Sequence, residues 1–302
     1  MKVTLNCLLI FCIGTASAQN WVDLGNIYWR TSPHNSIEGS TDKRNFNMFA
    51  ADVKLPVVLN DQSVLIFGLG YQHNQFTAVD EASTLTQLDF SSAELQIGME
   101  HKWNDRFKTL FMMIPRMNTD YTQVDIHHFQ LAGAVLNTYK RNDQFEWKYG
   151  LYYSPEFFAP MFVPLFGFDW KINEKWQFKM MIPVNFELAY RPKDWMRCGL
   201  RFDGVNASYR YQLIPSQDNT QTYIDKADNN GWVFTEFNLG KNIWFQLKGG
   251  YSVLRKYRFY DPDDRMNLKL GPVNIGDNRT SATPLFKNGW SFETRFIYRL
   301  PI

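Results

Sequence analysis

The segment QFEWKYGLYY, residues 144–153, alternates apolar and polar side chains along its whole length. One face would carry Phe145, Trp147, Tyr149, Leu151 and Tyr153, and the other Gln144, Glu146, Lys148, Gly150 and Tyr152. Successive side chains of a β-strand point to opposite faces, so a period of two predicts a strand rather than a helix. SAELQIGMEHKW (92–103) and the closing GWSFETRFIYRLPI (289–302) repeat this alternation.

The composition fits strands that have one apolar and one polar face. Aromatic residues make up 17% of the chain, yet its mean hydropathy is −0.36. A chain can be rich in aromatic residues and still polar on average when every second residue is polar, which is the pattern of a transmembrane β-strand. After residue 18 no apolar run approaches the roughly 20 residues that a transmembrane helix needs.

Two kinds of connection separate the alternating segments. Short polar turns recur at 59–62, 103–106, 141–144, 173–176, 191–195 and 240–243, and longer stretches lie at 31–43, 74–88, 118–127, 155–162, 213–230 and 257–288. Strands are predicted at 21–30, 44–57, 63–73, 89–103, 106–117, 128–140, 144–154, 163–172, 176–182, 185–191, 196–212, 231–240, 243–256 and 289–301. This gives about fourteen strands. Loss of the first strand or of the short hairpin at 176–191 would change the count, and twelve strands remain an alternative.

These features predict an all-β fold, an antiparallel up-and-down transmembrane β-barrel. Short turns at one end and long loops at the other are typical of outer-membrane barrels, with the short turns in the periplasm. The strands must close because an open sheet edge in lipid would leave backbone groups unpaired. Candidate interface aromatics are Trp103, Trp170, Trp176, Trp244, Tyr251 and Tyr298. The alternative, a soluble β-sandwich, has shorter strands.

Two local irregularities are expected within this barrel. The motif MMIP occurs at 112–115 and 180–183. Proline lacks the backbone donor of the ladder, so Pro115 and Pro183 are expected to end strands, Pro183 at a tight turn on the loop side. Polar residues change parity within 196–212, which predicts a β-bulge at Gly204.

The first residues predict export. Lys2, the apolar stretch LNCLLIFCIG and the small residues at 16–18 have the order of a signal peptide, so the domains are expected to be a signal peptide at 1–18 and a barrel at 19–302. Without Lys2 the chain has 31 basic and 30 acidic residues, and this balance gives no support to nucleic-acid binding. The expected location is the outer membrane of a Gram-negative bacterium.

The polar faces carry charges of both signs. The residues predicted to line the lumen are Glu94, Glu100, Lys102, Glu146, Lys148, Asp169, Lys171, Glu187, Arg191, Arg210, Glu236, Lys248, Glu293, Arg295 and Arg299. Opposite charges on neighbouring strands can pair, which would leave a narrow or partly filled lumen. A solvated wall explains the same pattern, and both alternatives stay open.

Metal-binding patterns are weak. The segment TDYTQVDIHH (119–128) brings Asp125 and His127 to one strand face, but no Cys or Glu cluster flanks them. The segment YDPDDRMN (260–267) has three aspartates without the Gly and closing Glu of a calcium loop. No metal or cofactor is predicted.

Catalytic patterns are equally sparse. His73 would lie close to Ser91 or Ser92 on the adjacent strand, with no motif around them. Cys198 stands alone on the expected lipid-facing parity, where a small apolar role fits it better than a reactive one. The chain is predicted not to be an enzyme and to have no catalytic residue.

Two resemblances add to this interpretation. The ending FIYRLPI resembles the carboxy-terminal strand that the barrel-assembly machinery recognises, although Ile302 stands where an aromatic residue is usual. Residues 185–210, 237–261 and the closing strand resemble an uncharacterised outer-membrane β-barrel family, a domain of unknown function common in Bacteroidota-type bacteria. The resemblance implies architecture and location, and it brings no catalytic residues.

The function predicted first is a channel or transporter for small solutes. A structural or adhesion barrel with a closed lumen, acting through loops such as 257–288, is the alternative, and a lipid-modifying enzyme is a third. The expected partners are outer-membrane lipid and the assembly machinery. Neither the solute nor the oligomeric state follows from the sequence.

Overall fold

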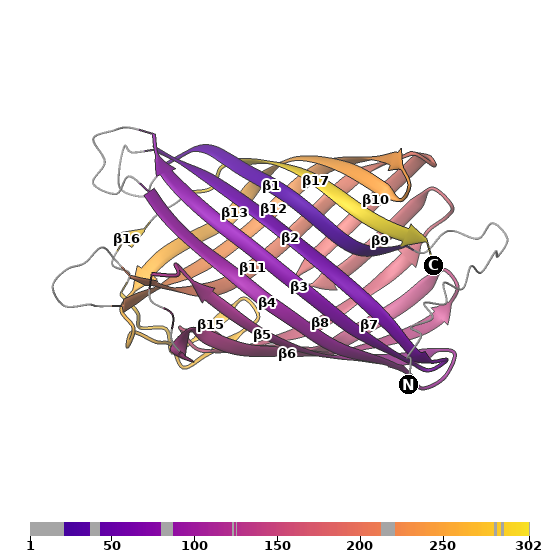
Figure 1. Ribbon diagram of the computed structural model, residues 1–302, viewed down its shortest axis with the longest axis horizontal. Helices are drawn as coiled ribbons and strands as arrows, with labels where there is room; N and C mark the ends of the chain where they lie inside the picture. Colours follow the sequence, from indigo (N-terminus) through magenta and orange to yellow (C-terminus); the bar gives the residue numbers. More distant parts are fainter. Residues whose placement is uncertain are drawn as a thin grey trace, which may run out of the picture.

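Fourteen long antiparallel strands close on themselves to form a barrel, seen from the side in Figure 1. The computed structural model describes residues 21–301 except 37–42, 80–86, 123, 125, 213–220, 281–282 and 285–286. The long strands are β1 (Trp21–Ser36), β2 (Lys43–Asn60), β3 (Ser63–Ala78), β4 (Gln87–Lys102), β5 (Phe107–Thr119), β6 (Phe129–Asn142), β7 (Phe145–Pro155), β8 (Pro160–Lys171), β9 (Trp176–Ile182), β10 (Asn185–Lys193), β11 (Met196–Gln212), β12 (Gln221–Gly240), β13 (Ile243–Tyr260) and β17 (Trp290–Pro301).

The first and last strands close the barrel. β17 pairs with β1 on one side and with β13 on the other, and Trp21 lies opposite Pro301. Each long strand therefore pairs with a neighbour on both sides over at least part of its length, and the sheet closes as a barrel in lipid requires. The predicted fold class and its fourteen strands are confirmed. We call the end with the short turns the turn end and the opposite one the loop end.

Several elements extend or add to the expected ones. β1 runs on to Ser36, and β12 begins at Gln221, where a loop was expected. Three short strands lie in the segment before β17, namely β14 (Leu268–Leu270), β15 (Val273–Ile275) and β16 (Thr283–Pro284), and a single 3-10 turn covers Ile126–His128. None of the helical residues described forms a helix long and apolar enough to span a membrane. The predicted signal peptide lies outside the described residues.

The two MMIP motifs lie in different settings. Pro183 follows β9 at the tight turn into β10, as predicted. The prediction for Pro115 is wrong, because this residue lies inside β5 opposite Leu131 of β6. The β4–β5 pairing skips two positions there, between Met113 and Arg116, so the missing donor breaks no bond to β4.

The strands β11, β12 and β13, which we call the leaning strands, lean across the interior at the loop end. β11 reaches β5, with Arg210 opposite Thr119, although five strands separate these two around the barrel. Both faces of the leaning strands are therefore covered: adjacent Tyr223 and Ile224 of β12 are both fully buried.

The bulge predicted at Gly204 is wrong. The pairing of β11 with β12 runs without a shift from Met196 to Gln212. A shift occurs instead between β12 and β13, at Ala227 and Asn229. The polar residues of β11 beyond Gly204 change parity because the strand leans inwards, so that its second face also meets protein rather than lipid.

An aromatic cluster fills the space between the leaning strands and β2–β4. Its buried members are Phe46, Met48, Phe76, Leu88, Phe90, Ala207, Tyr209, Ile224, Tyr257 and Phe259. The rings of Phe46 and Phe76 lie 4.8 Å apart, and those of Phe90 and Tyr209 lie 4.6 Å apart. This aromatic cluster closes one side of the lumen at the loop end.

The outer surface of the wall is apolar. Large exposed side chains include Leu55, Leu69, Phe111, Leu151, Phe166, Leu200, Val233 and Phe296. Five of the six candidate interface aromatics are also exposed, and the exception is Trp244. The prediction that Trp244 faces outwards is wrong. Its side chain lies on the same face of β13 as that of Lys248, and it packs in the lumen against Trp21, with ring centroids 5.9 Å apart.

Candidate functional site: the barrel lumen

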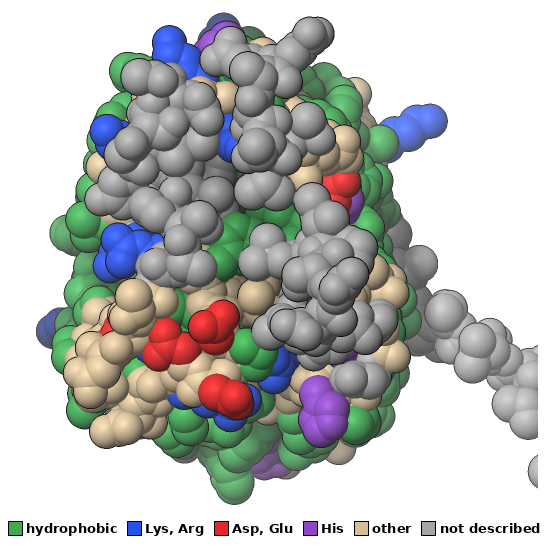
Figure 2. All heavy atoms as spheres, turned by 90° about the vertical axis from the view of Figure 1, so that its left-hand side faces the viewer, with side chains coloured by type: hydrophobic (Ala, Val, Ile, Leu, Met, Phe, Trp, Pro, Cys, Tyr) green, Lys and Arg blue, Asp and Glu red, His purple; other side chains and the backbone are tan. Residues whose placement is uncertain are grey.

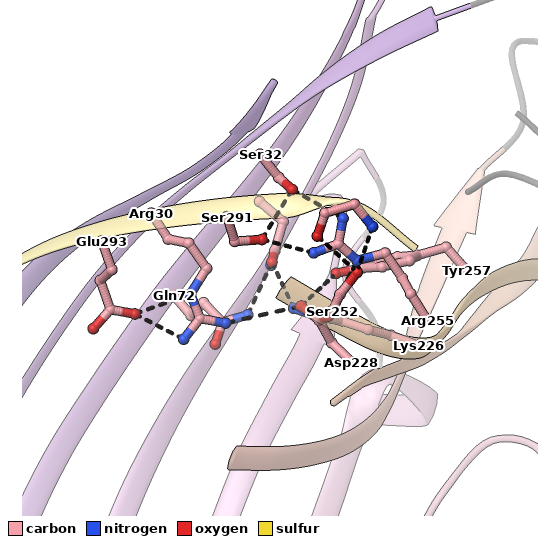
Figure 3. A network of polar contacts seen from close by, with 12 residues as sticks. Arg30, Ser32, Gln72, Lys226, Asp228, Ser252, Arg255, Tyr257, Ser291 and Glu293 are labelled. Carbon is pink, nitrogen blue, oxygen red and sulfur yellow. Dashed lines mark hydrogen bonds and ion pairs between the residues drawn. The ribbon is translucent and has the colours of Figure 1, made fainter. Parts of the chain in front are cut away.

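A buried network of ion pairs joins the inner faces of the neighbouring strands β12, β13, β17 and β1 (Figure 3). Glu293 of β17 accepts hydrogen bonds from Arg30 of β1, 2.9 Å to Nε and 2.7 Å to Nη2. The same carboxylate forms ion pairs with Lys248 at 2.9 Å and Arg295 at 2.8 Å. One buried carboxylate thus holds three cations from strands that meet at the closure of the barrel. Buried charges are tolerated only when they are paired in this way.

A second carboxylate extends the network towards the loop end. Asp228 of β12 accepts hydrogen bonds from Arg255 Nε at 3.2 Å and from the Tyr257 hydroxyl at 3.3 Å. Arg255 also donates to Ser32 at 3.0 Å and to Ser291 at 3.0 Å, as Figure 3 shows. These contacts join the leaning strands β12 and β13 to β1 and β17, and they seal the side of the lumen that the aromatic cluster fills.

The turn-end cavity has a volume of about 500 Å³ and a basic lining. Its cations are Lys54, Lys171, Lys175, Lys179, Arg191, Arg197, Arg201, Arg295 and Arg299, against the four anions Asp23, Glu174, Glu187 and Glu236. A cleft lined mainly by one sign of charge concentrates ions of the opposite sign. This cavity therefore favours anions.

Two carboxylates organise the arginines of the turn-end cavity. Glu236 binds Arg299 Nη1 at 2.9 Å and Arg197 Nη1 at 3.2 Å. Glu187 accepts a further hydrogen bond from Arg197 and one of 3.1 Å from Arg201. The alternating chain of charges keeps the guanidinium groups in place on the wall of the cavity.

The loop-end cavity has a volume of about 660 Å³. It lies between the inner faces of β4–β9 and the strands β11–β13, and Ala207 and Tyr209 of the aromatic cluster also border it. Figure 2 looks onto this end of the molecule, where acidic side chains gather beside apolar ones. The cavity is thus a separate space, formed because β11–β13 divide the interior.

A hydrogen-bonded clamp fixes β11 beside this cavity. Arg116 of β5 donates to Ser154 at 2.6 Å and to Glu156 at 2.5 Å. Glu156, in the connection between β7 and β8, also accepts from the Ser208 backbone at 2.8 Å and from its hydroxyl at 2.6 Å. The clamp joins β5, β7 and β11, and it keeps the leaning strand in position.

The residues predicted to line the lumen fall in several places. Lys171, Glu187, Arg191, Glu236, Arg295 and Arg299 border the turn-end cavity, Glu94 borders the loop-end cavity, and Lys248 and Glu293 belong to the buried network. Glu100 pairs with Lys108 at 3.0 Å, Lys102 with Asp105 at 2.8 Å, and Asp169 with Lys179 at 3.5 Å. Glu146 lies opposite Asp169, and Lys148 opposite Gly167, in the pairing of β7 with β8.

Arg210 lies apart from these residues. Because the register of β11 is unbroken, Arg210 occupies the face opposite to that of Arg201. Its guanidinium lies 4.7 Å from the centre of the Phe157 ring. Arg210 therefore packs against the connection between β7 and β8. That any of these residues lines a path for a solute stays a prediction.

Several residues of the buried network were missed. Lys226 and Asp228 lie in a stretch that was interpreted as a loop, although Ile224, Lys226 and Asp228 continue the alternation of β12. Arg255 lies with Leu254 in the bulge opposite Asp228, which reverses the parity of β13. Lys226 and Asp228 could have been found from the alternation. The inward position of Arg255 depends on a bulge that no residue type marks.

The catalytic and metal-binding patterns considered in the sequence receive limited support. The predicted proximity of His73 and Ser91 is confirmed, with 2.9 Å between Nδ1 and Oγ. Ser91 is only 2% exposed, however, which leaves its hydroxyl out of reach of a substrate. Within the described ranges no cluster of three His, Cys, Asp or Glu side chains could hold a metal ion, and Asp125 lies outside them.

The closed barrel, its apolar exterior and its charged interior define the class: this is a β-barrel of the outer-membrane type. The chain belongs to the family described as a domain of unknown function (DUF6268), which residues 15–265 match. No curated protein matches the sequence.

Similarity to solved structures concerns the fold. The COG4313 outer membrane channel from Pseudomonas putida F1 is similar with a TM-score of 0.51 and 8% identity, over 95% of this chain and 97% of that one. The translocator domain of the autotransporter NalP from Neisseria meningitidis gives a TM-score of 0.39 at 11% identity, over 92% and 89%. The NanC porin gives 0.37 at 6% identity, over 91% and 100%.

Proposed function

We propose that this protein is a channel or transporter for small solutes in the outer membrane of a Gram-negative bacterium. The observation that carries the proposal is the pair of cavities inside the closed wall, about 500 Å³ at the turn end and about 660 Å³ at the loop end. A barrel that served only as a scaffold would need no such space beside its filled core.

The two cavities adjoin at the β9–β10 hairpin. Lys179 borders the turn-end cavity, and Met181, two residues along the same face of β9, borders the loop-end cavity. On β10, Asn185 borders the first and the preceding Val184 the second. The proposed path therefore runs along this hairpin, past the side of the lumen that the aromatic cluster leaves free.

The basic lining of the turn-end cavity supports a preference for anions along this path. Nine cations against four anions would raise the local concentration of an anionic solute relative to a cation of the same size. Lys54 is a suitable probe, because it borders the cavity and forms no ion pair with the residues that the structure describes.

The test is the conductance of the purified protein in a planar lipid bilayer under a tenfold KCl gradient. We expect stable single-channel steps with a reversal potential on the chloride side. Lys54→Glu should shift that potential towards potassium. Lys193→Glu is the matched control, since Lys193 lies over the Trp195 ring at 5.7 Å, outside both cavities, and should leave the potential unchanged.

The aromatic cluster favours a second candidate, a structural or adhesion barrel whose loops carry the function. Ten buried residues fill one side of the lumen. A folded protein that stays electrically silent under the same KCl gradient would contradict the channel proposal and support this alternative.

The proposal also covers how the barrel is assembled and the kind of bacterium from which it comes. The alternating β17, which closes the barrel against β1, supports recognition by the barrel-assembly machinery. A Bacteroidota-type origin is likewise proposed from the resemblance of the quoted segments. Truncating the chain before Phe296 should abolish assembly in cells, and normal membrane insertion of that variant would contradict the proposal.

A further inference from the structure

We infer that the loop-end cavity binds a small amphipathic anion, a molecule with an apolar body and one acidic group. The inference deepens the proposed function by naming a solute class, and in that sense rests on it. It is carried by the apolar part of the cavity lining and by Lys269, a buried lysine whose ammonium forms no hydrogen bond or ion pair with the residues that the structure describes.

One side of the cavity is apolar, which is unusual for the interior of such a barrel. Its lining includes Leu136, Tyr152, Met161, Val163, Leu165 and Met181, which come from four neighbouring strands. Met161 and Val163 belong to a buried cluster around Phe158, and Tyr152 and Leu165 pack against that cluster. Together with Leu136 and Met181 they form an apolar wall of the cavity. An apolar ligand body would remove their surface from water, which is the main source of affinity in small-molecule sites.

The cavity exists because the wall has a notch above the β9–β10 hairpin. The last pair between β8 and β9 is Phe166 with Ile182, so the remainder of β8 has no β9 partner. The β14–β15 hairpin covers this part instead, with Lys269 opposite Met161 in a parallel pairing. A loop element, rather than a transmembrane strand, thus forms one wall of the cavity.

The cavity lining also carries charged groups, and several of them already form ion pairs. Arg279 donates to Asp277 at 2.8 Å, to Asp225 at 3.1 Å and to the Tyr223 hydroxyl at 3.2 Å. Arg116 is held by Glu156 at 2.5 Å. These arginines are therefore poor candidates for binding a new anion.

Lys269 differs from these arginines. It borders the cavity and is only 7% exposed, yet its ammonium forms no hydrogen bond or ion pair with any residue that the structure describes. Its Nζ lies 5.2 Å from the centre of the Phe158 ring. Burial lowers the pKa of Lys269, while the charge of Asp225 opposes that shift. A buried ammonium with free donors is a site that a carboxylate can satisfy.

The probe is 4-phenylbutyrate, with 4-phenylbutanol and 4-phenylbutylamine as its neutral and cationic counterparts. Binding is measured by isothermal titration calorimetry on the folded protein in dodecyl maltoside micelles, with empty micelles as the blank. We expect phenylbutyrate to bind about tenfold more tightly than phenylbutanol, because a charge-assisted hydrogen bond is added. Equal affinities, tighter binding of the amine, or no binding above the blank would overturn the inference.

Variants separate the two sides of the cavity. Lys269→Met keeps the apolar stem over Phe158 and should remove the advantage of phenylbutyrate while leaving phenylbutanol unchanged. Leu165→Asn, a change of similar volume, should weaken both ligands. Lys102→Met, at an exposed turn, is the control and should alter neither. Faster migration of unheated samples on SDS gels shows that each variant has folded.

The result is independent of conduction. Binding by a protein that gives no current in the bilayer would keep the site and refute the channel. Stable channels without selective phenylbutyrate binding would keep the channel and refute the site. An unchanged preference for phenylbutyrate in Lys269→Met would likewise refute the assigned role of this lysine.

Discussion

Glu293 shows how a single side chain can hold the closure of the barrel. Its side chain is fully buried, and it pairs with Arg30 on β1, with Lys248 on β13 and with Arg295 on its own strand. Because β17 is the neighbour of β1, these pairs hold the closure of the barrel. Removing the carboxylate would take from these three cations the nearest anion that the structure describes for them.

We therefore expect Glu293→Gln to lower the free energy of unfolding by about 3–5 kcal/mol, the usual cost of removing one partner of a buried ion pair. Urea unfolding in micelles, followed by tryptophan fluorescence, measures this change. Asp105→Asn serves as the control, because Asp105 is paired only at an exposed turn and its loss should leave the midpoint unchanged. Identical midpoints for Glu293→Gln and the native protein would contradict the prediction.

Asp277 gives the loop hairpin a defined dependence on pH. The hydrogen bond from Arg279 holds the pKa of this carboxyl below its ordinary value. A lowered pKa means that the folded loop favours the charged form, so the stabilisation is complete above the ordinary value of about 3.9 and is lost as the pH falls through the lowered value. The loop should thus keep its structure from neutral pH down to about 4.

Hydrogen exchange of the amides in 268–280, corrected for the intrinsic rate, should stay constant down to about pH 4 and rise below it. Asp277→Asn should exchange faster than the native protein above about pH 4, because the amide cannot form the ion pair, and the two should converge at lower pH. A native loop whose corrected exchange stays constant to pH 2 would show that Asp277 does not hold it.

At the scale of elements, the lean of β11–β13 decides the shape of the interior. These strands are long, and their loop-end parts carry apolar residues on the inner face, among them Tyr209, Ile224 and Phe259. An inward lean buries these side chains against Phe46 and Phe76 instead of leaving them in a water-filled lumen. The short β9–β10 hairpin permits the lean, since β11 has no β10 partner beyond Asp203.

Phe76→Ala should therefore affect both stability and conduction. Phe76 is 1% exposed at the centre of the aromatic cluster, and its truncation should cost about 3–5 kcal/mol of unfolding free energy. The void it leaves should also raise the single-channel conductance. Phe67→Ala, on the lipid face of the same strand, should leave the conductance unchanged. A variant with native stability would mean that the cluster relaxes around the gap.

At the scale of the whole molecule, the arrangement of turns and loops predicts its orientation. Short turns of outer-membrane barrels lie in the periplasm and long loops outside the cell. In a Cys198→Ser background, a membrane-impermeant maleimide should label Asp263→Cys in the long segment after β13 on intact cells. Asp143→Cys, in the turn between β6 and β7, should react only after the outer membrane is permeabilised. The reverse pattern would invert the proposed orientation.

Most of the wall could be predicted from the sequence because each strand carries its own signal. Alternation in segments such as 144–153 identifies the strand and its two faces without reference to any neighbour. The polar turns give the connections, and the need to pair every backbone group in lipid gives the closure. The predicted strand count, the antiparallel order and the turn at Pro183 were all confirmed on this basis.

The interior depended on tertiary structure. Whether Lys248 meets Glu293 depends on the register of β13 with β17, and whether Arg210 meets Phe157 depends on the lean of β11. The notch that exposes Lys269 to a cavity arises from unequal strand lengths around the closed wall, and Arg255 turns inwards at a bulge in β13. Local alternation determines which face of a strand is polar; only the closed barrel decides which polar groups meet, because that depends on contacts across the lumen rather than along the chain.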